Sequence, residues 1–410
     1  MLRQLVAFAL LLQPPFALPA ADTVTIAHID PTSGPFANVG LSLGRHLQAA
    51  VDEINAKGGL FNGARLEVVH LDSKSSPQES ILALQQVIDR GIRYITQANG
   101  SNIAHALSEA VTRHNARNPD RAILYLNLAA IDPALTNEKC SFWHFRFDAN
   151  VDMKMEVLTS YMIQQKGIRK LYLINQDYAQ GQAISRAVKA MLKSKRPDIE
   201  IVGDDLHPIG KVKDFSPYVA KIKASGADTV LTGNWGSDLS LLVKAGKAAG
   251  LTADYYALFA YIAGSPTAIG ESGANRVKVL STWHMNIPGN KLEEFALDYK
   301  ERYGEDLWLN NARTQMNMLA GAMKAAQSAD PLQVAFALEG MKVEGDAGEL
   351  WMRSDDHQLM QPLFLATFAK AGKGVKYDVE NLGLGWREEA RIEGRDTVLP
   401  TTCRMERPPR

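Results

Sequence analysis

The chain has 410 residues, which is more than one hydrophobic core normally supports, and this length predicts two domains. Hydrophobic residues make up 46% and charged residues 22% of the sequence, so the composition excludes a disordered or coiled-coil chain. The 45 basic residues are balanced by 45 acidic ones, which argues against nucleic-acid binding because that function needs a basic face.

The N-terminus has the pattern of a secretory signal peptide. Arg3 supplies positive charge, Val6–Leu12 is an apolar run too short to cross a bilayer, and Ala20-Ala21 offers small residues for cleavage. An N-terminal anchor helix is the alternative, but the prolines that follow the apolar run would break it. We therefore expect residues 1–21 to be a signal peptide that is cleaved on export, which places the mature protein in the periplasm.

Short β-like runs then alternate with helix-periodic runs. Strands are predicted at Val24–Ile29, Leu66–Leu71, Tyr94–Gln97 and Ala122–Leu126. Between them, apolar residues recur at steps of three and four over Leu43–Ile54, Ile81–Ile88 and Ile103–Val111. This alternation of strands and helices predicts a parallel, doubly wound α/β sheet.

The alternation restarts after a segment, Cys140–Asp152, that has neither pattern and suits a crossover between two similar lobes. The strands predicted in the second series are Lys170–Ile174, Glu200–Gly203, Thr229–Thr232, Tyr255–Leu258 and Val277–Thr282. The helices predicted there lie near Gln182–Leu192, Tyr218–Ala224 and Leu239–Ala249. Residues 291–338 are predicted to be mostly helical, and Leu363–Phe368 to be a further strand.

Cys140 and Cys403 are the two cysteines of the sequence. In an oxidising compartment they can form one disulfide, which would tie the C-terminal tail to the middle of the chain. Two free thiols are the alternative. We favour the disulfide, because export removes the protein from the reducing pool.

Ligands of open α/β sheets bind beyond the carboxyl ends of the strands. In the first series, the loop Ser33–Ala37 offers a hydroxyl and close backbone approach. Ser101, in Gly100-Ser101-Asn102, is either a plain helix N-cap or part of an anion site at a helix N-terminus. Asn127–Ile131 holds small residues that either admit a ligand or simply pack tightly.

The corresponding loops of the second series carry aromatic residues. Tyr178 follows the first strand of this series, and Asn234-Trp235 lies between two glycines after the third. Phe259 and Tyr261 follow the next strand. These rings are predicted to wall a ligand site, with ordinary lobe packing as the alternative.

Signals for chemistry are absent from the sequence. It contains no G-x-S-x-G, H-E-x-x-H, G-x-x-x-x-G-K-[ST] or, after a strand, G-x-G-x-x-G. Cys140 and His144 lie four residues apart, but one Cys and one His do not make a zinc site. We therefore predict no catalytic residue, no metal and no cofactor, and a protein that is not an enzyme.

Seven short segments occur in a characteristic order: Thr32–Ala37, Asp52–Leu60, Leu71-Asp72, Ser76-Pro77, Ala130–Thr136, Phe145-Arg146 and Asp214–Pro217. Together they resemble the type I periplasmic substrate-binding proteins of ABC transporters, in the leucine/isoleucine/valine-binding family. The resemblance implies two doubly wound parallel-sheet lobes joined by three crossovers, with the ligand in a cleft that closes by a hinge. It implies an N-terminal lobe of residues 22–146 plus 285–345 and a C-terminal lobe of residues 147–284 plus 346–410.

The resemblance also implies roles for individual residues. Ser101 corresponds to the serine that holds a ligand carboxylate, and Phe36 or Val39 to the residue that meets the ligand side chain. Ala129 corresponds to a small residue whose backbone contacts the ligand, and Tyr178 and Trp235 to aromatic residues of the second lobe. The predicted ligand-binding residues are Ser33, Phe36, Ser101, Asn102, Asn127, Ala129, Tyr178, Asn234, Trp235, Phe259 and Tyr261.

The chain departs from the family pattern in two places. Ile131 stands where the family usually has Thr, and the acidic residue that pairs with a ligand ammonium has no clear counterpart near Phe259-Ala260-Tyr261. A buried ammonium without a carboxylate is costly, so we expect a small carboxylate with an apolar or aromatic body. The predicted function is capture of this ligand for an ABC permease by a monomer; the alternative is a ligand sensor of the same fold.

Overall fold

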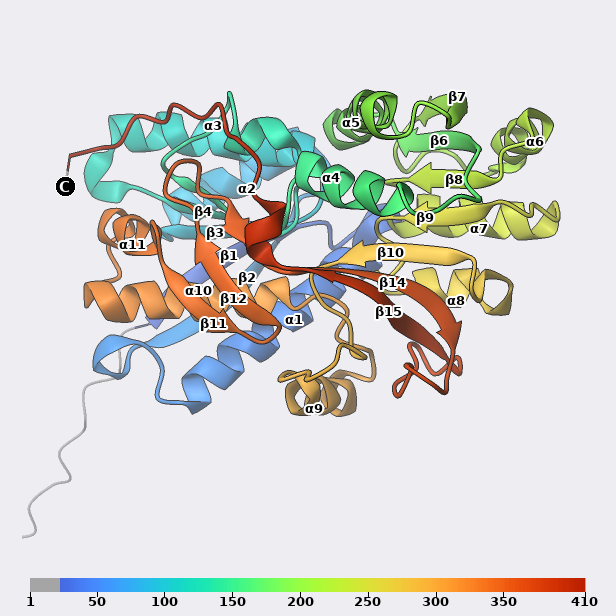
Figure 1. Cartoon of the computed structure of the whole chain (residues 1–410). Helices are drawn as coiled ribbons and strands as arrows, with labels where there is room; N and C mark the ends of the chain where they lie inside the picture. The colour runs from blue at the N-terminus through green and yellow to red at the C-terminus, as the bar shows by residue number, and fades with distance from the viewer. Residues whose placement is uncertain (1–22, 410) are drawn as a thin grey trace, which may run out of the picture.

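The computed structural model describes residues 23–409 and consists of two α/β lobes side by side (Figure 1). The predicted signal peptide, residues 1–21, lies outside the described residues. Each lobe is built on a sheet with helices on both faces, which confirms the α/β, doubly wound fold. None of the helices between residues 23 and 409 is long and apolar enough to cross a membrane.

The sheet of the first lobe has five parallel strands in the order β2-β1-β3-β4-β5. Its strands are β1 (Thr23–Asp30), β2 (Arg65–Asp72), β3 (Tyr94–Gln97), β4 (Leu124–Asn127) and β5 (His144–Arg146). Four of them match the predicted strands within two residues. The short β5 falls in the segment for which the sequence predicted neither strand nor helix.

Helices cover both faces of this sheet because the strand order reverses after β2. One face carries α1 (Ala37–Ala56) and α10 (Asn311–Ala326), and the other carries α2 (Pro77–Asp89) and α3 (Ser101–Arg117). The short α11 (Pro331–Leu338) packs against α10 and β4. Ser76 is the N-cap of α2, and its hydroxyl accepts a hydrogen bond from the Glu79 N–H, as the S-P-x-E sequence favours.

The sheet of the second lobe has seven strands in the order β15-β14-β10-β9-β8-β6-β7. Its parallel strands are β6 (Lys170–Gln176), β7 (Glu200–His207), β8 (Thr229–Thr232), β9 (Asp254–Ala257) and β10 (Val277–Ser281). The last two strands in sequence are β14 (Leu363–Lys370) and β15 (Leu384–Ile392). β14 is antiparallel to β10, and β15 is antiparallel to β14. The sheet's helices are α4 (Val151–Met162), α5 (Ala179–Lys195), α6 (Ser216–Ser225), α7 (Gly236–Ala248) and α8 (Ser265–Ile269).

The chain passes between the two sheets at residues 147–150, after β10 and at residues 361–362. The second passage contains α9 (Glu293–Tyr303), which lies at the bottom of Figure 1. Before the third passage, β11 (Lys342–Gly345), β12 (Gly348–Met352) and β13 (Leu359–Met360) form a small antiparallel sheet. These passages are the three crossovers expected for the fold.

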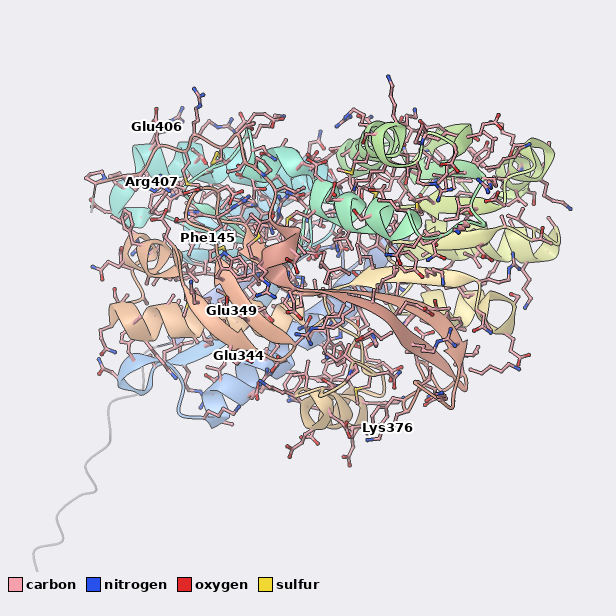
Figure 2. All side chains as sticks on the ribbon, in the orientation of Figure 1. Phe145, Glu344, Glu349, Lys376, Glu406 and Arg407 are labelled. Carbon is pink, nitrogen blue, oxygen red and sulfur yellow. A yellow bond between two sulfur atoms is a disulfide. The ribbon has the colours of Figure 1, made fainter. Side chains whose placement is uncertain are left out.

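The C-terminal tail returns to the first lobe. Cys403 forms a disulfide with Cys140, which confirms the predicted bridge. The Thr401 hydroxyl donates to the Thr136 carbonyl at 2.8 Å, and Arg407 pairs with Glu339 at 2.9 Å. Figure 2 shows Glu406 and Arg407 near the end of this tail, over the first lobe.

These contacts bear on the lobe boundaries. The sequence placed residues 346–410 in the second lobe, whereas β12 pairs with β11 and the tail is bound to the first lobe. We therefore propose a first lobe of residues 23–146, 285–360 and 399–409, and a second lobe of residues 147–284 and 363–392. The predicted disulfide already implied that the tail reaches Cys140, whereas its contacts with Thr136 and Glu339 have no local sequence signal because these partners are distant in sequence.

Candidate functional site

The loops at the carboxyl ends of β1, β3 and β4 face those of β6, β8 and β9, and the two sets meet at the boundary of the lobes. A cavity of about 30 Å³, which we call the cleft cavity, lies between them. Its lining residues are Leu43, Ala98, Asn99, Gly100, Ala129, Gln180, Trp235, Phe259, Tyr261, Ile262, Trp308 and Leu309. Both lobes contribute, so the cavity depends on how the lobes are placed relative to each other.

Phe36 of the first lobe packs against Trp235 of the second. The two ring centroids are 4.2 Å apart and the planes are inclined by 35°. The glycines Gly210 and Gly236 make room for Phe36, because a Cβ at either position would lie within 3 Å of its ring. Asn38 adds a polar contact, its side-chain amide lying 3.4 Å from the Ala263 carbonyl. The lobes are therefore closed on each other at this edge.

Trp235 is held in place from the second lobe. Its indole N–H donates to the Tyr178 hydroxyl at 2.9 Å, and both side chains are about 95% buried. Burial raises the pKa of Tyr178, so the hydroxyl stays neutral. Tyr178 thus supports Trp235, which lines the cavity, from the loop after β6.

Three helices begin at this boundary: α3 after Gly100, α5 after Tyr178 and α7 after Trp235. The N-cap residues of the three helices make no side-chain cap within residues 23–409, but Asn102 accepts the Ala179 N–H of α5 at 3.4 Å, and the buried Asp238 lies in the first turn of α7. Uncapped N-termini leave backbone N–H donors free and carry partial positive charge. No Asp, Glu, Lys or Arg lines the cleft cavity. The cavity therefore favours an anionic group without providing a carboxylate for a cation.

Asn99 supplies a further donor. It is 9% exposed, lines the cavity, and its side-chain NH₂ has no hydrogen-bond partner within residues 23–409. Its loop is fixed by Asp30, which accepts the N–H groups of Ala98 and Asn99 at 2.9 and 2.8 Å. A buried donor without a partner is costly, so Asn99 is suited to hydrogen-bond an oxygen in the cavity.

The rest of the wall is aromatic. Phe259, Tyr261 and Trp308 line the cavity and are all at least 92% buried. Behind Phe259 lies the buried ion pair of Lys154 and Asp148, whose Nζ and Oδ1 atoms are 2.9 Å apart. Burial raises the pKa of Tyr261 well above 10, so it is present as a neutral phenol. Such a wall offers apolar and aromatic contacts, but the closed cavity of about 30 Å³ has room for little more than water, so an aromatic body enters only when the lobes open further.

Comparison with known proteins gives the family. Residues 23–373 match the family described as "Periplasmic binding protein". The chain belongs to the periplasmic binding protein family. It is 33% identical over 400 residues to Leu/Ile/Val-binding protein homolog 4 of Brucella melitensis biotype 1, a match that covers 95% of this chain and 94% of the relative. This confirms the predicted type I, leucine/isoleucine/valine-binding resemblance.

Solved structures agree with this assignment. The closed conformation of the leucine-, isoleucine-, valine-, threonine- and alanine-binding protein from Brucella ovis has a TM-score of 0.83 and 31% identity, and the match covers 95% of this chain and all of that one. The R. palustris solute-binding protein in complex with 4-hydroxybenzoate has a TM-score of 0.77 at 20% identity, covering 92% and 98%. The family consists of substrate-binding proteins of ABC transport systems rather than enzymes.

Of the residues predicted for this periplasmic binding protein's ligand site, four line the cleft cavity: Ala129, Trp235, Phe259 and Tyr261. Two more, Phe36 and Tyr178, contact Trp235 from outside the cavity. These six residues come from loops of both lobes, and the structure brings them together.

The other predicted residues use their polar groups within the protein. The Ser33 hydroxyl donates to Asp72 at 2.6 Å, and the Ser101 hydroxyl accepts the Asp132 N–H at 3.3 Å. Ser101 is also the first helical residue rather than the N-cap, which is Gly100. None of these side chains lines the cleft cavity.

The remaining three are asparagines. Asn127 exchanges hydrogen bonds with the backbone of Ala130, and the Asn234 amide nitrogen lies 2.8 Å from His207 Nε2. Asn102 is exposed and accepts the Ala179 N–H at 3.4 Å across the lobe boundary. Asn127 and Asn234 thus stabilise the loops that carry Ala129 and Trp235, and Asn102 joins the lobes.

Sequence reasoning missed Asn99, Gln180 and Trp308. Asn99 directly precedes the Gly100-Ser101-Asn102 motif, so its position at the strand end was a usable signal. Gln180 lies in the first turn of α5. Trp308 lies in an irregular segment between α9 and α10, and no local pattern marks it as a cleft residue. No group of three or more His, Cys, Asp or Glu that could hold a metal ion occurs within residues 23–409.

Proposed function

We propose that this chain is the extracytoplasmic substrate-binding component of an ABC importer. In this proposal residues 1–21 are removed on export, and the protein captures its ligand in the periplasm as a monomer without catalysis. Closure of the two lobes around the ligand then presents a surface to a membrane permease. The family assignment supports the transport role.

We propose that the ligand is a small carboxylate with an apolar or aromatic body. The observation that carries this proposal is the convergence of three helix N-termini and the unpaired Asn99 amide on a cavity whose lining has no charged side chain. The helix ends and the amide would hold the carboxylate. Phe259, Tyr261 and Trp308 would contact the body.

The same lining disfavours an α-ammonium group in the cavity. A buried ammonium needs a carboxylate or several acceptors, and the lining contains no Asp or Glu. The relatives named for leucine, isoleucine and valine make amino acids the main competing ligands. The 4-hydroxybenzoate complex shows that proteins of this fold can hold an aromatic acid.

A ligand screen tests the proposal. We expect benzoate, 4-hydroxybenzoate or phenylacetate to raise the melting temperature of the mature protein more than leucine or valine does, because a ligand of the folded state stabilises it. Calorimetry then gives the affinity of the best compound. Tight binding of leucine or valine without affinity for aromatic acids would overturn the proposed ligand class.

Variants locate the binding site. Asn99→Ala should weaken binding of the best carboxylate by about 10- to 100-fold, because a hydrogen bond to a charged group contributes about 1.5–3 kcal/mol. Asn118→Ala, an exposed asparagine at the opposite end of α3, is the matched control and should bind as the wild type does. Equal affinities of the two variants would place the carboxylate elsewhere.

A further inference from the structure

A second cavity lies beside the cleft cavity and is larger, with a volume of about 280 Å³. Its walls come from α9, the segment between α9 and α10, the passage after β10 and the loop between β14 and β15. It shares Tyr261 and Trp308 with the cleft cavity, and these two rings stand between the two spaces. We call it the α9 cavity.

The loop over the α9 cavity is held firmly. The Tyr377 hydroxyl and the Lys376 ammonium contact the Glu293 carboxylate of α9 at 2.5 and 2.8 Å. The Asn286 side chain exchanges two hydrogen bonds with the Tyr377 backbone, both 2.8 Å long. Figure 2 shows Lys376 on the lower surface beside α9. The exposed side chain of Leu297, which also lines the cavity, marks its opening to solvent.

Aromatic residues supply most of the walls: Tyr261, Trp283, Trp308, Tyr377 and Trp386. The indole N–H of Trp283 donates to Asn290 at 3.1 Å, and that of Trp308 donates to Ser42 at 2.8 Å. Because these N–H groups are already used, both rings offer the cavity carbon surface. Several aromatic rings around one space are the setting in which organic cations are bound by cation–π attraction.

The charges of the lining favour a cation as well. It contains one Lys and four carboxylates. Lys300 pairs with Asp306 at 2.8 Å, and Glu305 pairs with Arg45 at 2.5 Å.

Of the four carboxylates that line the α9 cavity, Asp378 and Glu380 have no cationic partner within residues 23–409. Glu380 accepts the Gly264 and Thr267 N–H groups, at 2.5 and 2.7 Å, and Asp378 accepts the Gly383 N–H at 2.8 Å. These hydrogen bonds fix both carboxylates at the cavity and leave their negative charge unneutralised.

His284 adds an acceptor. It lines the α9 cavity, is 3% exposed, and neither ring nitrogen has a hydrogen-bond partner within residues 23–409. Burial lowers its pKa to about 3, so the ring is neutral at physiological pH and one nitrogen carries a free lone pair. An ammonium can donate to that nitrogen.

We propose that the α9 cavity is a second ligand site, which binds a small organic cation consisting of an ammonium group on an apolar or aromatic body. The aromatic rings hold the body, Asp378 and Glu380 supply the attracting charge, and His284 accepts a hydrogen bond. The site differs in charge from the uncharged cleft cavity, and it does not depend on the ligand proposed for the cleft.

Three probes with the same ring test the charge preference. Calorimetry on the mature protein would compare 2-phenylethylammonium with its neutral analogue 2-phenylethanol and with the anion 3-phenylpropionate. We expect the ammonium to bind at least tenfold more tightly than the alcohol in the α9 cavity. Equal binding of the ammonium and the alcohol, or no binding of the ammonium, would overturn the proposal.

Variants assign the site. His284→Phe keeps a ring of similar size and should weaken the ammonium about tenfold while leaving 2-phenylethanol unchanged. Asp378→Asn should weaken the ammonium by several-fold, and melting curves confirm that both variants are folded. Asn99→Ala alters the lining of the cleft cavity without touching that of the α9 cavity or the Phe36–Trp235 contact, so it should leave ammonium binding unchanged. Loss of ammonium binding in Asn99→Ala, with retention in His284→Phe, would assign the cation to the cleft and overturn the second site.

Discussion

Phe36 and Trp235 join the two lobes of this periplasmic binding protein, with their ring centroids 4.2 Å apart. One residue follows β1 and the other follows β8, so the contact exists only when the lobes are closed. The pair therefore links the hinge position to the wall of the ligand cleft.

Removing this contact should favour the open arrangement. An aromatic pair contributes about 0.5–1.5 kcal/mol beyond the area it buries, so Phe36→Ala should raise the ratio of open to closed molecules by roughly 2- to 10-fold. Small-angle X-ray scattering would detect the change as a larger radius of gyration. Phe61→Ala, a half-buried aromatic residue away from the lobe boundary, is the control. Identical scattering of both variants would show that the pair does not stabilise closure.

The disulfide should stabilise the attachment of the tail. Replacing Cys140 and Cys403 together by Ser should lower the free energy of unfolding by about 2–4 kcal/mol. Limited proteolysis should then cut the tail after residue 398 faster than in the wild type, since only hydrogen bonds, the Arg407–Glu339 ion pair and the packing of Leu399 and Met405 would still hold the described part of the tail. Dithiothreitol should reproduce the effect in the wild type and add nothing in the double variant. A variant as stable as the oxidised wild type would contradict this expectation.

Buried histidines should make the protein sensitive to acid. Burial lowers the pKa of His46 and His284 to about 3, and that of His144 well below 6.5. Below pH 6.5 the unfolded chain takes up protons that the folded protein excludes, so stability is full above this pH and falls as the pH decreases.

Each such histidine contributes a slope of up to about 1.4 kcal/mol per pH unit. Urea unfolding at pH 7, 6 and 5 measures this slope, and the range avoids most carboxylate titration. In His46→Phe the phenyl ring can pack between Tyr299 and Trp308 as the imidazole does. This variant should reduce the slope of the unfolding free energy against pH by the contribution of one histidine. A stability that does not change between pH 7 and 5 would refute the assignment.

Arg146 should be important for stability. It is fully buried and donates to the Gln358 side chain at 2.7 Å, to the Asp132 carbonyl at 2.5 Å and to the Thr136 hydroxyl. Arg146→Met leaves these acceptors without a donor. It should lower the free energy of unfolding, measured with urea, by about 3 kcal/mol. Arg117→Met, at the exposed end of α3, should cost less than about 1 kcal/mol. Similar costs for the two would argue against a special role for Arg146.

The sequence was informative wherever local periodicity decides structure. The strands β3 and β8 lie between helices and were predicted to the residue, and β1 was predicted to within one residue at each end. β15 was not predicted, because the polar residues Arg387–Glu389 interrupt its apolar pattern. It lies at the edge of the sheet, where it pairs antiparallel with β14. β5 has three residues, too few for a period to show.

The lining of the cleft cavity was predictable in part, where a loop directly follows a strand. Ala129, Trp235, Phe259 and Tyr261 were predicted as ligand-binding residues by that rule; they line the cleft cavity, and their contact with a ligand stays a prediction. Ser33 and Asn127 also follow strands, but their side chains form hydrogen bonds with Asp72 and Ala130 and do not line the cavity. Those partners are decided by packing, which no single loop sequence reveals.

The disulfide also imposes an order on biosynthesis. The two cysteines are 263 positions apart in sequence, so the first lobe's sheet and the whole of the second lobe's sheet are synthesised before Cys403 emerges. During that interval Cys140 is a thiol without its partner. In the periplasmic location proposed above, two incompletely translocated chains could cross-link through this thiol, so rapid overproduction would favour disulfide-linked dimers over chains with the Cys140–Cys403 bridge.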